Sequence, residues 1–258
     1  MESIKDRIVI IIGTVGYPTF NKCLEHAERI KKIDDNVEKI IIVKDKYPIS
    51  AWLNEMIKLS QGFNWCLQLD EDMYAYENAA KELLLLAKRE QKNGIKINNA
   101  SAMLNDIFLK HKIGSIKLWN VDSLQMGTFK DVLGSDRQFA KDAEKNGFYN
   151  ASTSVVLGEH DSAPSVEIAY FKYKEYISKI KHFQGIEEAR KSIKYFRNIY
   201  KIENTKIAYA AYIGAVAGIK ANYMPKTKNY LDNVNSDEIE ILYRNLKKSN
   251  CNFLGKRR

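Results

Sequence analysis

Residues 65–73, WCLQLDEDM, carry the clearest indication of the architecture of this chain. This stretch begins as a short apolar run and ends in three carboxylates, Asp70, Glu71 and Asp72. An apolar run of this length, bounded by polar residues, is typical of a strand buried inside a parallel sheet. Ligands of open α/β sheets bind just beyond the carboxyl ends of such strands. The three acids are therefore predicted to lie at a binding edge.

Three adjacent carboxylates repel one another and lose hydration unless a positive group holds them. A divalent metal is the simplest candidate, because hard cations prefer carboxylate oxygens and bridge to phosphates. In an extended chain Asp70 and Asp72 share one side, and Glu71 points to the other. The alternative is a solvated turn between a strand and a helix, because short acidic clusters are common on protein surfaces.

The N-terminal part of the chain alternates between strand and helix patterns. The expected elements, in order, are a strand at 7–12, a helix at 20–33, a strand at 37–43, a helix at 49–60, the strand within 65–73 and a helix at 76–91. This alternation predicts the α/β class with a doubly wound, mostly parallel sheet. Gly13, Asp45 and Asp70 each lie at the carboxyl end of a strand, so we expect all three on one edge.

The pattern is less regular after residue 94. The expected elements are a short helix at 101–110, strands at 115–120, 125–129 and 153–157, and a helix at 134–146. Amphipathic helices rich in lysine and aromatic residues then follow at 165–182, 186–200, 205–220 and 237–248. We therefore expect a catalytic domain at residues 1–164 and a helical C-terminal extension at 165–258.

Composition narrows the classes of protein that fit. The 258 residues are 45% hydrophobic, which is enough for a sizeable core, and no apolar stretch reaches the roughly 18 residues of a membrane span. The charged N-terminus does not resemble a signal peptide, and three scattered cysteines suit a reducing, cytoplasmic setting. The net charge of +9 favours an anionic partner, or simply reflects a lysine-rich surface.

The order of these features resembles the nucleotide-diphospho-sugar transferase (GT-A) fold, and most of all the family 2 type of glycosyltransferases. Residues 70–72 match that family's Asp-X-Asp motif, and residues 134–139 (GSDRQF), 147–148 (GF) and 158–160 (GEH) resemble its second half. The resemblance covers roughly residues 5–165. The loops after the first two strands depart from the family pattern, which leaves the identity of the base and the sugar open.

The resemblance implies an inverting, metal-dependent glycosyltransferase that moves a sugar from a nucleotide sugar to a cell-surface glycan or a lipid-linked acceptor. It implies that Asp70, Asp72 and His160 hold Mn²⁺ or Mg²⁺, and that Asp136 is the catalytic base. The donor, a UDP-sugar in the first instance, is expected to contact the other edge residues, namely Gly13, Thr14, Asp45, Asp70 and Glu71. The alternatives are a helix cap at Asp136, a structural histidine at His160 and a solvated turn at Asp45.

Two other classes of function compete with this one. A nucleotidyltransferase normally has a Gly-rich loop with Arg or Lys after its first strand, and residues 13–18 contain neither. A nucleic-acid-binding protein suits the basic charge, but no binding motif is visible and the acidic edge repels phosphates. The lysine- and aromatic-rich helices suggest peripheral contact with the inner face of a membrane, and the alternative is packing against the catalytic domain or in a homodimer.

Overall fold

The computed structural model describes residues 5–223, 240, 241, 243 and 244. The chain divides into two compact units, Met1–Ser162 and Ala163–Arg258. The helix expected at residues 237–248 lies mostly outside the described residues.

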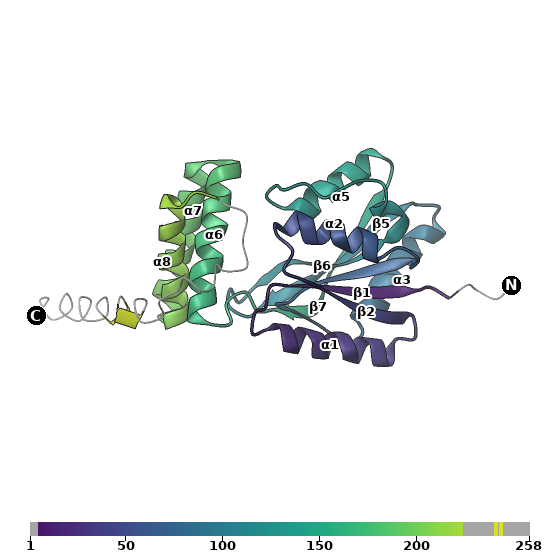
Figure 1. Ribbon diagram of the computed structural model, residues 1–258, viewed down its shortest axis with the longest axis horizontal. Helices are drawn as coiled ribbons and strands as arrows, with labels where there is room; N and C mark the ends of the chain where they lie inside the picture. The colour runs from purple at the N-terminus through teal and green to yellow at the C-terminus, as the bar shows by residue number, and fades with distance from the viewer. Residues whose placement is uncertain (1–4, 224–239, 242, 245–258) are drawn as a thin grey trace, which may run out of the picture. The chain divides into compact units, whose positions relative to one another are not determined.

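The first unit is an α/β structure built around one sheet (Figure 1). Its strands are β1 (Ile8–Thr14), β2 (Val37–Lys44), β3 (Trp65–Asp70), β4 (Met73–Ala75), β5 (Ile97–Asp106), β6 (Lys112–Asn120) and β7 (Tyr149–His160). Its helices are α1 (Phe20–Ile33), α2 (Ile49–Leu59), α3 (Ala79–Lys92), α4 (Val121–Leu124) and α5 (Ser135–Lys145).

The sheet has the strand order β2-β1-β3-β6-β5-β7-β4. β1 is parallel to β2 and β3, and β5 is parallel to β7, whereas β6 is antiparallel to both of its neighbours and β4 is antiparallel to β7. Five of the seven strands therefore point the same way, which confirms the predicted α/β class with a mostly parallel sheet. We call the edge where these five strands end the carboxyl edge.

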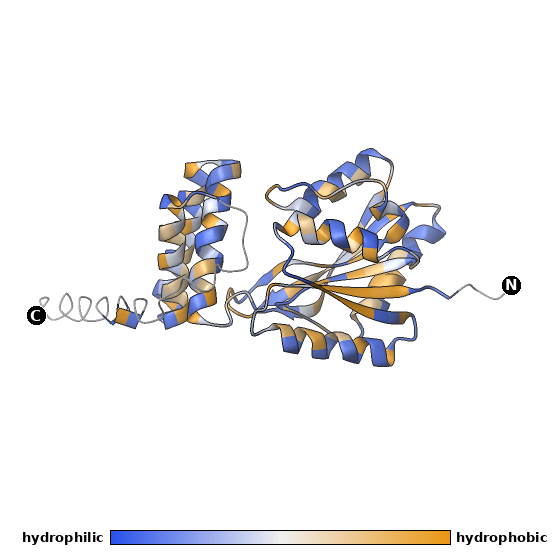
Figure 2. Ribbon diagram, viewed as in Figure 1, coloured by the Kyte–Doolittle hydropathy of each residue, from blue (hydrophilic) through white to orange (hydrophobic). Residues whose placement is uncertain are grey.

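Helices cover both faces of the sheet, and this explains the uninterrupted apolar strands. In β1, Ile10 and Ile12 enter a core shared with α1 and α3, while Val9 and Ile11 enter a second core shared with α2 and α5. Figure 1 shows α1 and α2 on opposite sides of β1, and in Figure 2 that strand is almost wholly hydrophobic. Burial on both faces favours β-branched residues at every position, not only at alternate ones.

Two predicted elements are wrong. The helix expected at residues 101–110 is instead the second half of β5, whose alanines and asparagines have low strand propensity but are buried between β6 and β7. The strand expected at residues 125–129 is absent from the described structure. There the side chain of Asn54 accepts from the backbone N–H of Phe129 at 2.8 Å and donates to its carbonyl at 3.0 Å, in place of a neighbouring strand.

The connection between β3 and β4 forces the sheet to curl. Asp70 and Met73 are three Cα steps apart and so lie within roughly 11 Å of each other. Four inter-strand spacings separate β3 from β4 in the strand order, which would be roughly 19 Å in a flat sheet. The sheet must therefore bend until β4 and the end of β7 come close to the end of β3.

The second unit is helical, with α6 (Val166–Gln184), α7 (Ile186–Glu203) and α8 (Lys206–Lys220). Some of its aromatic residues form its own core, as with Tyr173 and Phe196, whose ring centroids are 4.3 Å apart. Tyr176 and Tyr195 stay 44% and 43% exposed, so surface contact by this unit remains a prediction. No helix in the described residues is long and apolar enough to cross a membrane.

Two glycines allow α8 to pack closely against α6. A Cβ atom at Gly214 would collide with the carbonyl oxygen of Tyr170, and one at Gly218 would collide with that of Lys174. At the end of α8, the Lys181 ammonium donates to the carbonyls of Ile219 and Ala221 at 2.9 and 2.6 Å. A cation at this end of a helix also opposes the negative pole of its dipole.

We predict that Gly214→Ala destabilises the helical unit by about 1–3 kcal/mol, because a methyl group there must push two backbones apart. Thermal unfolding followed by circular dichroism measures the change. The matched control is Val216→Ala on the same helix, where the side chain is 40% exposed and the expected change is below about 0.5 kcal/mol. Equal stability of the two variants would refute close packing at Gly214.

Candidate functional site

The carboxyl edge gathers polar residues from every strand that ends there. Thr14, Asp70, Asp106 and His160 are the last residues of β1, β3, β5 and β7, and Asp45 directly follows β2. Four of these residues were candidates from the sequence, and Asp106 was not. The shared strand direction, rather than proximity in the sequence, brings them to one edge.

Glu71 holds the loop between β1 and α1. Its carboxylate accepts from the Thr14 hydroxyl at 2.5 Å and from the backbone N–H groups of Val15, Gly16 and Tyr17 at 3.0, 3.2 and 2.8 Å. Glu71 is only 5% exposed, and hydrogen-bond donors here replace the water that a buried carboxylate needs. Gly16 has a φ of 91°, which a residue with a side chain rarely adopts. The middle acid of the motif thus shapes the loop that lines the edge.

The neighbouring loops are tied to the same edge. The backbone N–H of Asp45 donates to the carbonyl of Thr14 at 3.0 Å, which links the end of β2 to the end of β1. Gly13 lies beneath the indole of Trp52, and a Cβ atom there would be 2.7 Å from a ring carbon. Gly13 therefore makes room for Trp52 of α2, and the structure brings it next to Asp70 in the register of β1 and β3.

Asp72 and His160 come together through the pairing of β4 with β7, in which His160 lies opposite Met73. The Nε2 atom of His160 is 3.4 Å from Oδ2 of Asp72, and its Nδ1 atom is 2.7 Å from Oδ2 of Asp106. Asp106 is buried and also accepts from the Ser162 hydroxyl and the Leu109 N–H. Burial raises the pKa of Asp106, but the hydrogen bonds from His160, Leu109 and Ser162 outweigh burial and lower it. A carboxylate can only accept, so Nδ1 of His160 donates to Asp106, and Nε2 is the ring nitrogen that faces Asp72.

This arrangement suits a metal ligand, because ligating histidines usually donate their other ring N–H to a carboxylate. Within the described part of the chain, no group of three or more His, Cys, Asp or Glu side chains is placed to hold a metal ion. Asp72 and His160 could supply two ligands, at a separation of 3.4 Å. The other positions would fall to diphosphate oxygens and water, which is usual for Mg²⁺ at phosphate sites.

Asp136 forms an ion pair. It lies in the first turn of α5, and Nζ of Lys117 from β6 is 2.5 Å from its Oδ2 atom. Burial raises the pKa of the Asp136 carboxyl, but Lys117, together with the backbone and side chain of Arg137, lowers it below its ordinary value. Asp136 is thus an anion near neutral pH, and the pairing makes it a weaker base than an isolated carboxylate.

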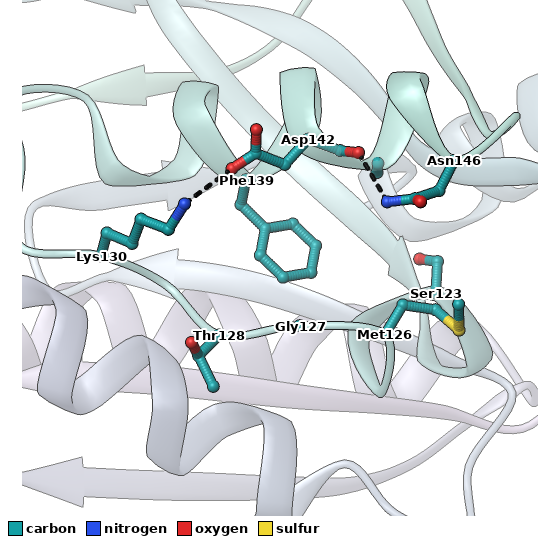
Figure 3. A pocket seen from close by; sticks show the side chains of 9 residues that line it. Ser123, Met126, Gly127, Thr128, Lys130, Phe139, Asp142 and Asn146 are labelled. Carbon is teal, nitrogen blue, oxygen red and sulfur yellow. Dashed lines mark hydrogen bonds and ion pairs between the residues drawn. The ribbon is translucent and has the colours of Figure 1, made fainter.

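A cavity of about 240 Å³ lies further along α5, between this helix and the chain from Ser123 to Lys130 (Figure 3). In Figure 3 the Phe139 ring points from the helix toward that chain, and Lys130 reaches Asp142 at 3.3 Å. None of the carboxyl-edge residues lines the cavity. It marks the far end of the helix that carries Asp136, not the edge itself.

Asp106 and Lys117 are the site residues that the sequence did not reveal. Asp106 falls in a segment with a helical composition, so its place at the end of a strand is visible only in the structure. Lys117 falls in a correctly predicted strand, but its partner Asp136 is 19 residues away in another element. If β5 were predicted as a strand, its last residue, Asp106, would be expected at the carboxyl edge.

No protein-family model matches this chain, and no curated protein matches it in sequence. Among solved structures it is similar to residues 1–349 of S. aureus TarS, with 12% identity and a TM-score of 0.45 over 80% of this chain and 70% of that one. It is also similar to A197 from STIV, with 12% identity and a TM-score of 0.42 over 60% and 85% of the two chains. A glycosyltransferase involved in glycosylating the major capsid of PBCV-1 matches with 10% identity and a TM-score of 0.40 over 60% and 93%. The activity proposed below rests on the side chains of this chain.

We predict that Glu71→Gln loosens the loop between β1 and α1. An amide offers one acceptor oxygen and turns its own N–H groups toward backbone donors, so the buried site loses about 1–3 kcal/mol. Hydrogen exchange of residues 14–17 should speed up markedly. Glu77→Gln, at an exposed position, is the control and should leave exchange unchanged. Equal protection in both variants would contradict the role of Glu71.

We predict that Asp106→Asn weakens Mn²⁺ binding by about 10–100-fold, the usual cost of losing the partner of a ligating histidine. The amide would donate to Nδ1 of His160 and so move the ring proton to Nε2, the atom that faces Asp72. Isothermal titration with Mn²⁺ measures the affinity. His160→Ala should weaken binding to a similar extent, and normal affinity in both variants would remove His160 from any metal site.

Proposed function

We propose that this protein is a metal-dependent glycosyltransferase that uses a nucleotide-sugar donor. The observation that carries the proposal is the Asp72–His160–Asp106 arrangement at the carboxyl edge of an α/β sheet. It supplies an oxygen and a nitrogen ligand where such folds bind nucleotides. Mixed oxygen and nitrogen ligands favour Mn²⁺ modestly over Mg²⁺.

The loops around this edge support a nucleotide as the ligand. The loop from Thr14 to Tyr17, which Glu71 holds, and the turn at Asp45 are joined by a hydrogen bond and lie next to each other at this edge. A carboxylate at Asp45 suits a hydrogen bond from a base N–H, such as that of uracil. A metal held by Asp72 and His160, with Asp70 beside it, would neutralise charge on the leaving diphosphate when it is bound.

Asp136 acts as the general base in the proposed transfer step. The acceptor hydroxyl oxygen bonds to the anomeric carbon and gives its proton to the Asp136 carboxylate. The bond from that carbon to the diphosphate oxygen breaks, and its electron pair stays on the diphosphate. Attack from the face opposite the leaving group inverts the anomeric centre.

The acceptor side is proposed to be a cell-surface glycan or a lipid-linked sugar. Exposed aromatic side chains on α6 and α7, Tyr176 and Tyr195, lie among lysines, which suits reversible contact with an anionic membrane surface. A homodimer through the same helices is the alternative. Sedimentation with anionic vesicles at low and high salt separates the two, because only surface attachment weakens steeply with ionic strength.

We predict that UDP and Mn²⁺ together raise the melting temperature more than either ligand alone. Saturating ligand at 100 times its Kd stabilises a protein by about 2.7 kcal/mol. In Asp72→Asn the metal-dependent part of the shift should disappear while the unliganded melting temperature stays close to that of the wild type. Differential scanning fluorimetry with a panel of nucleoside diphosphates and nucleotide sugars measures the effect.

The control is Asp35→Asn, at an exposed turn position, which should respond like the wild type. A shift by nucleotide that ignores both Mn²⁺ and Asp72→Asn would contradict metal-dependent donor binding. Stabilisation by DNA or RNA that falls steeply with salt would instead favour the nucleic-acid alternative.

A further inference from the structure

We propose that Lys117 is a positioning residue of the reaction, whose ammonium group holds the Asp136 carboxylate as an anion at one place above the sheet. This inference rests on the proposed function, in which Asp136 takes the proton of the acceptor hydroxyl. Lys117 lies outside the sequence motifs at residues 70–72, 134–139, 147–148 and 158–160.

The burial of Lys117 shows that the pair is built into the structure. Its side chain is 10% exposed, and its Nζ atom is 2.5 Å from Oδ2 of Asp136. A buried ammonium group loses its hydration and needs a charged or hydrogen-bonded partner. Exposed lysines elsewhere on α5, such as Lys145 at 73% exposure, make ion pairs that solvent screens.

The register of the sheet places this pair beside the Asp-X-Asp motif. Lys117 lies directly opposite Gln68 in the β3–β6 pairing, and Gln68 accepts from the Trp119 indole N–H at 2.8 Å. Strand alternation puts Asp70, two residues after Gln68, on the same face. Lys117 and Asp70 therefore line one face of the sheet near the carboxyl edge, and α5 packs over that face.

Aromatic packing prevents α5 from moving away. Phe139, one turn after Asp136, stacks on Phe129 at a centroid distance of 4.3 Å and meets Trp119 edge-on at 5.7 Å. The Ser135 hydroxyl donates to the Lys130 carbonyl at 2.7 Å and fixes the start of the helix. Because packing holds both Lys117 and Asp136 in place, the ion pair fixes the orientation of the Asp136 carboxylate.

The charges around Asp136 decide how it titrates. Burial raises its pKa, but Lys117 of β6 and Arg137 of its own helix outweigh burial and lower it. A folded-state pKa below the unfolded value of about 3.9 means that the pair stabilises the fold above that pH and is lost as pH falls through the lower value. When Asp136 takes a proton, the buried Lys117 ammonium loses its anionic partner. This cost favours release of the proton from Asp136.

The test combines the titration of Asp136 with the pH dependence of turnover. Carboxyl ¹³C NMR follows Asp136 in the wild type, Lys117→Arg and Lys117→Met, with Asp136→Asn identifying the signal. We expect Asp136 to titrate below pH 3.9 in the wild type, to stay low in Lys117→Arg, and to gain at least tenfold in proton affinity in Lys117→Met. The acid limb of turnover, measured with the nucleotide sugar found by the panel, should move to higher pH only in Lys117→Met.

Titration of wild-type Asp136 at or above the ordinary value would overturn the inference without any variant. So would an unchanged titration in Lys117→Met. If Lys117→Met fails to fold, Lys117→Met/Asp136→Asn should recover folding, because it removes both charges, and failure to recover would also count against the pair. If the titrations behave as expected but Asp136→Asn keeps full turnover, the ion pair stands and the general-base assignment of the proposed function fails.

Discussion

Only two residues, Glu71 and Asp72, connect β3 to β4, and this short connection determines the shape of the sheet in the first unit. β4 pairs with β7 at the far end of the strand order, although its chain begins only three Cα steps after β3. The sheet can satisfy both conditions only by curling. The pairing of β4 with β7 puts His160 beside Asp72, and the curl brings both residues close to the end of β3. The geometry of the candidate site therefore follows from strand pairing and chain connectivity.

The three adjacent acids at this connection have different surroundings. Asp70 ends a strand and lies on the face that also holds Lys117. Glu71 turns to the loop after β1 and fixes its shape through backbone donors. Asp72 meets His160. The Thr14 hydroxyl and three backbone N–H groups relieve the repulsion at Glu71, and a cation bound by Asp72 and His160 would relieve it further.

Much of the fold could be predicted from the sequence, because it depends on local patterns. Apolar β-branched strands, helical spacing and the alternation of the two define the parallel half of the sheet and its carboxyl edge. β5 was misread, because its sequence, INNASAMLND, lacks the composition of a strand and is held by its neighbours. Residues 125–129 do not form the expected strand, because the side chain of Asn54, and not a neighbouring strand, pairs with the backbone of Phe129.

The candidate site was predictable only as far as strand ends reveal it. The edge residues followed from the direction of the strands, but their partners did not. Asp106 and Lys117 act through contacts with residues 54 and 19 positions away, and no local pattern encodes such pairs. The function of Glu71 as a loop clamp is likewise a tertiary property, because the donors come from a loop more than fifty residues earlier.

We propose that the carboxyl edge binds a metal and a diphosphate at the same place. Anomalous diffraction from crystals of the full chain soaked with Mn²⁺ and UDP would test this. We expect a Mn²⁺ peak within bonding distance of an Asp72 oxygen and Nε2 of His160, with the diphosphate bound to the same ion. A metal bound elsewhere, or a nucleotide seated away from this edge, would contradict it.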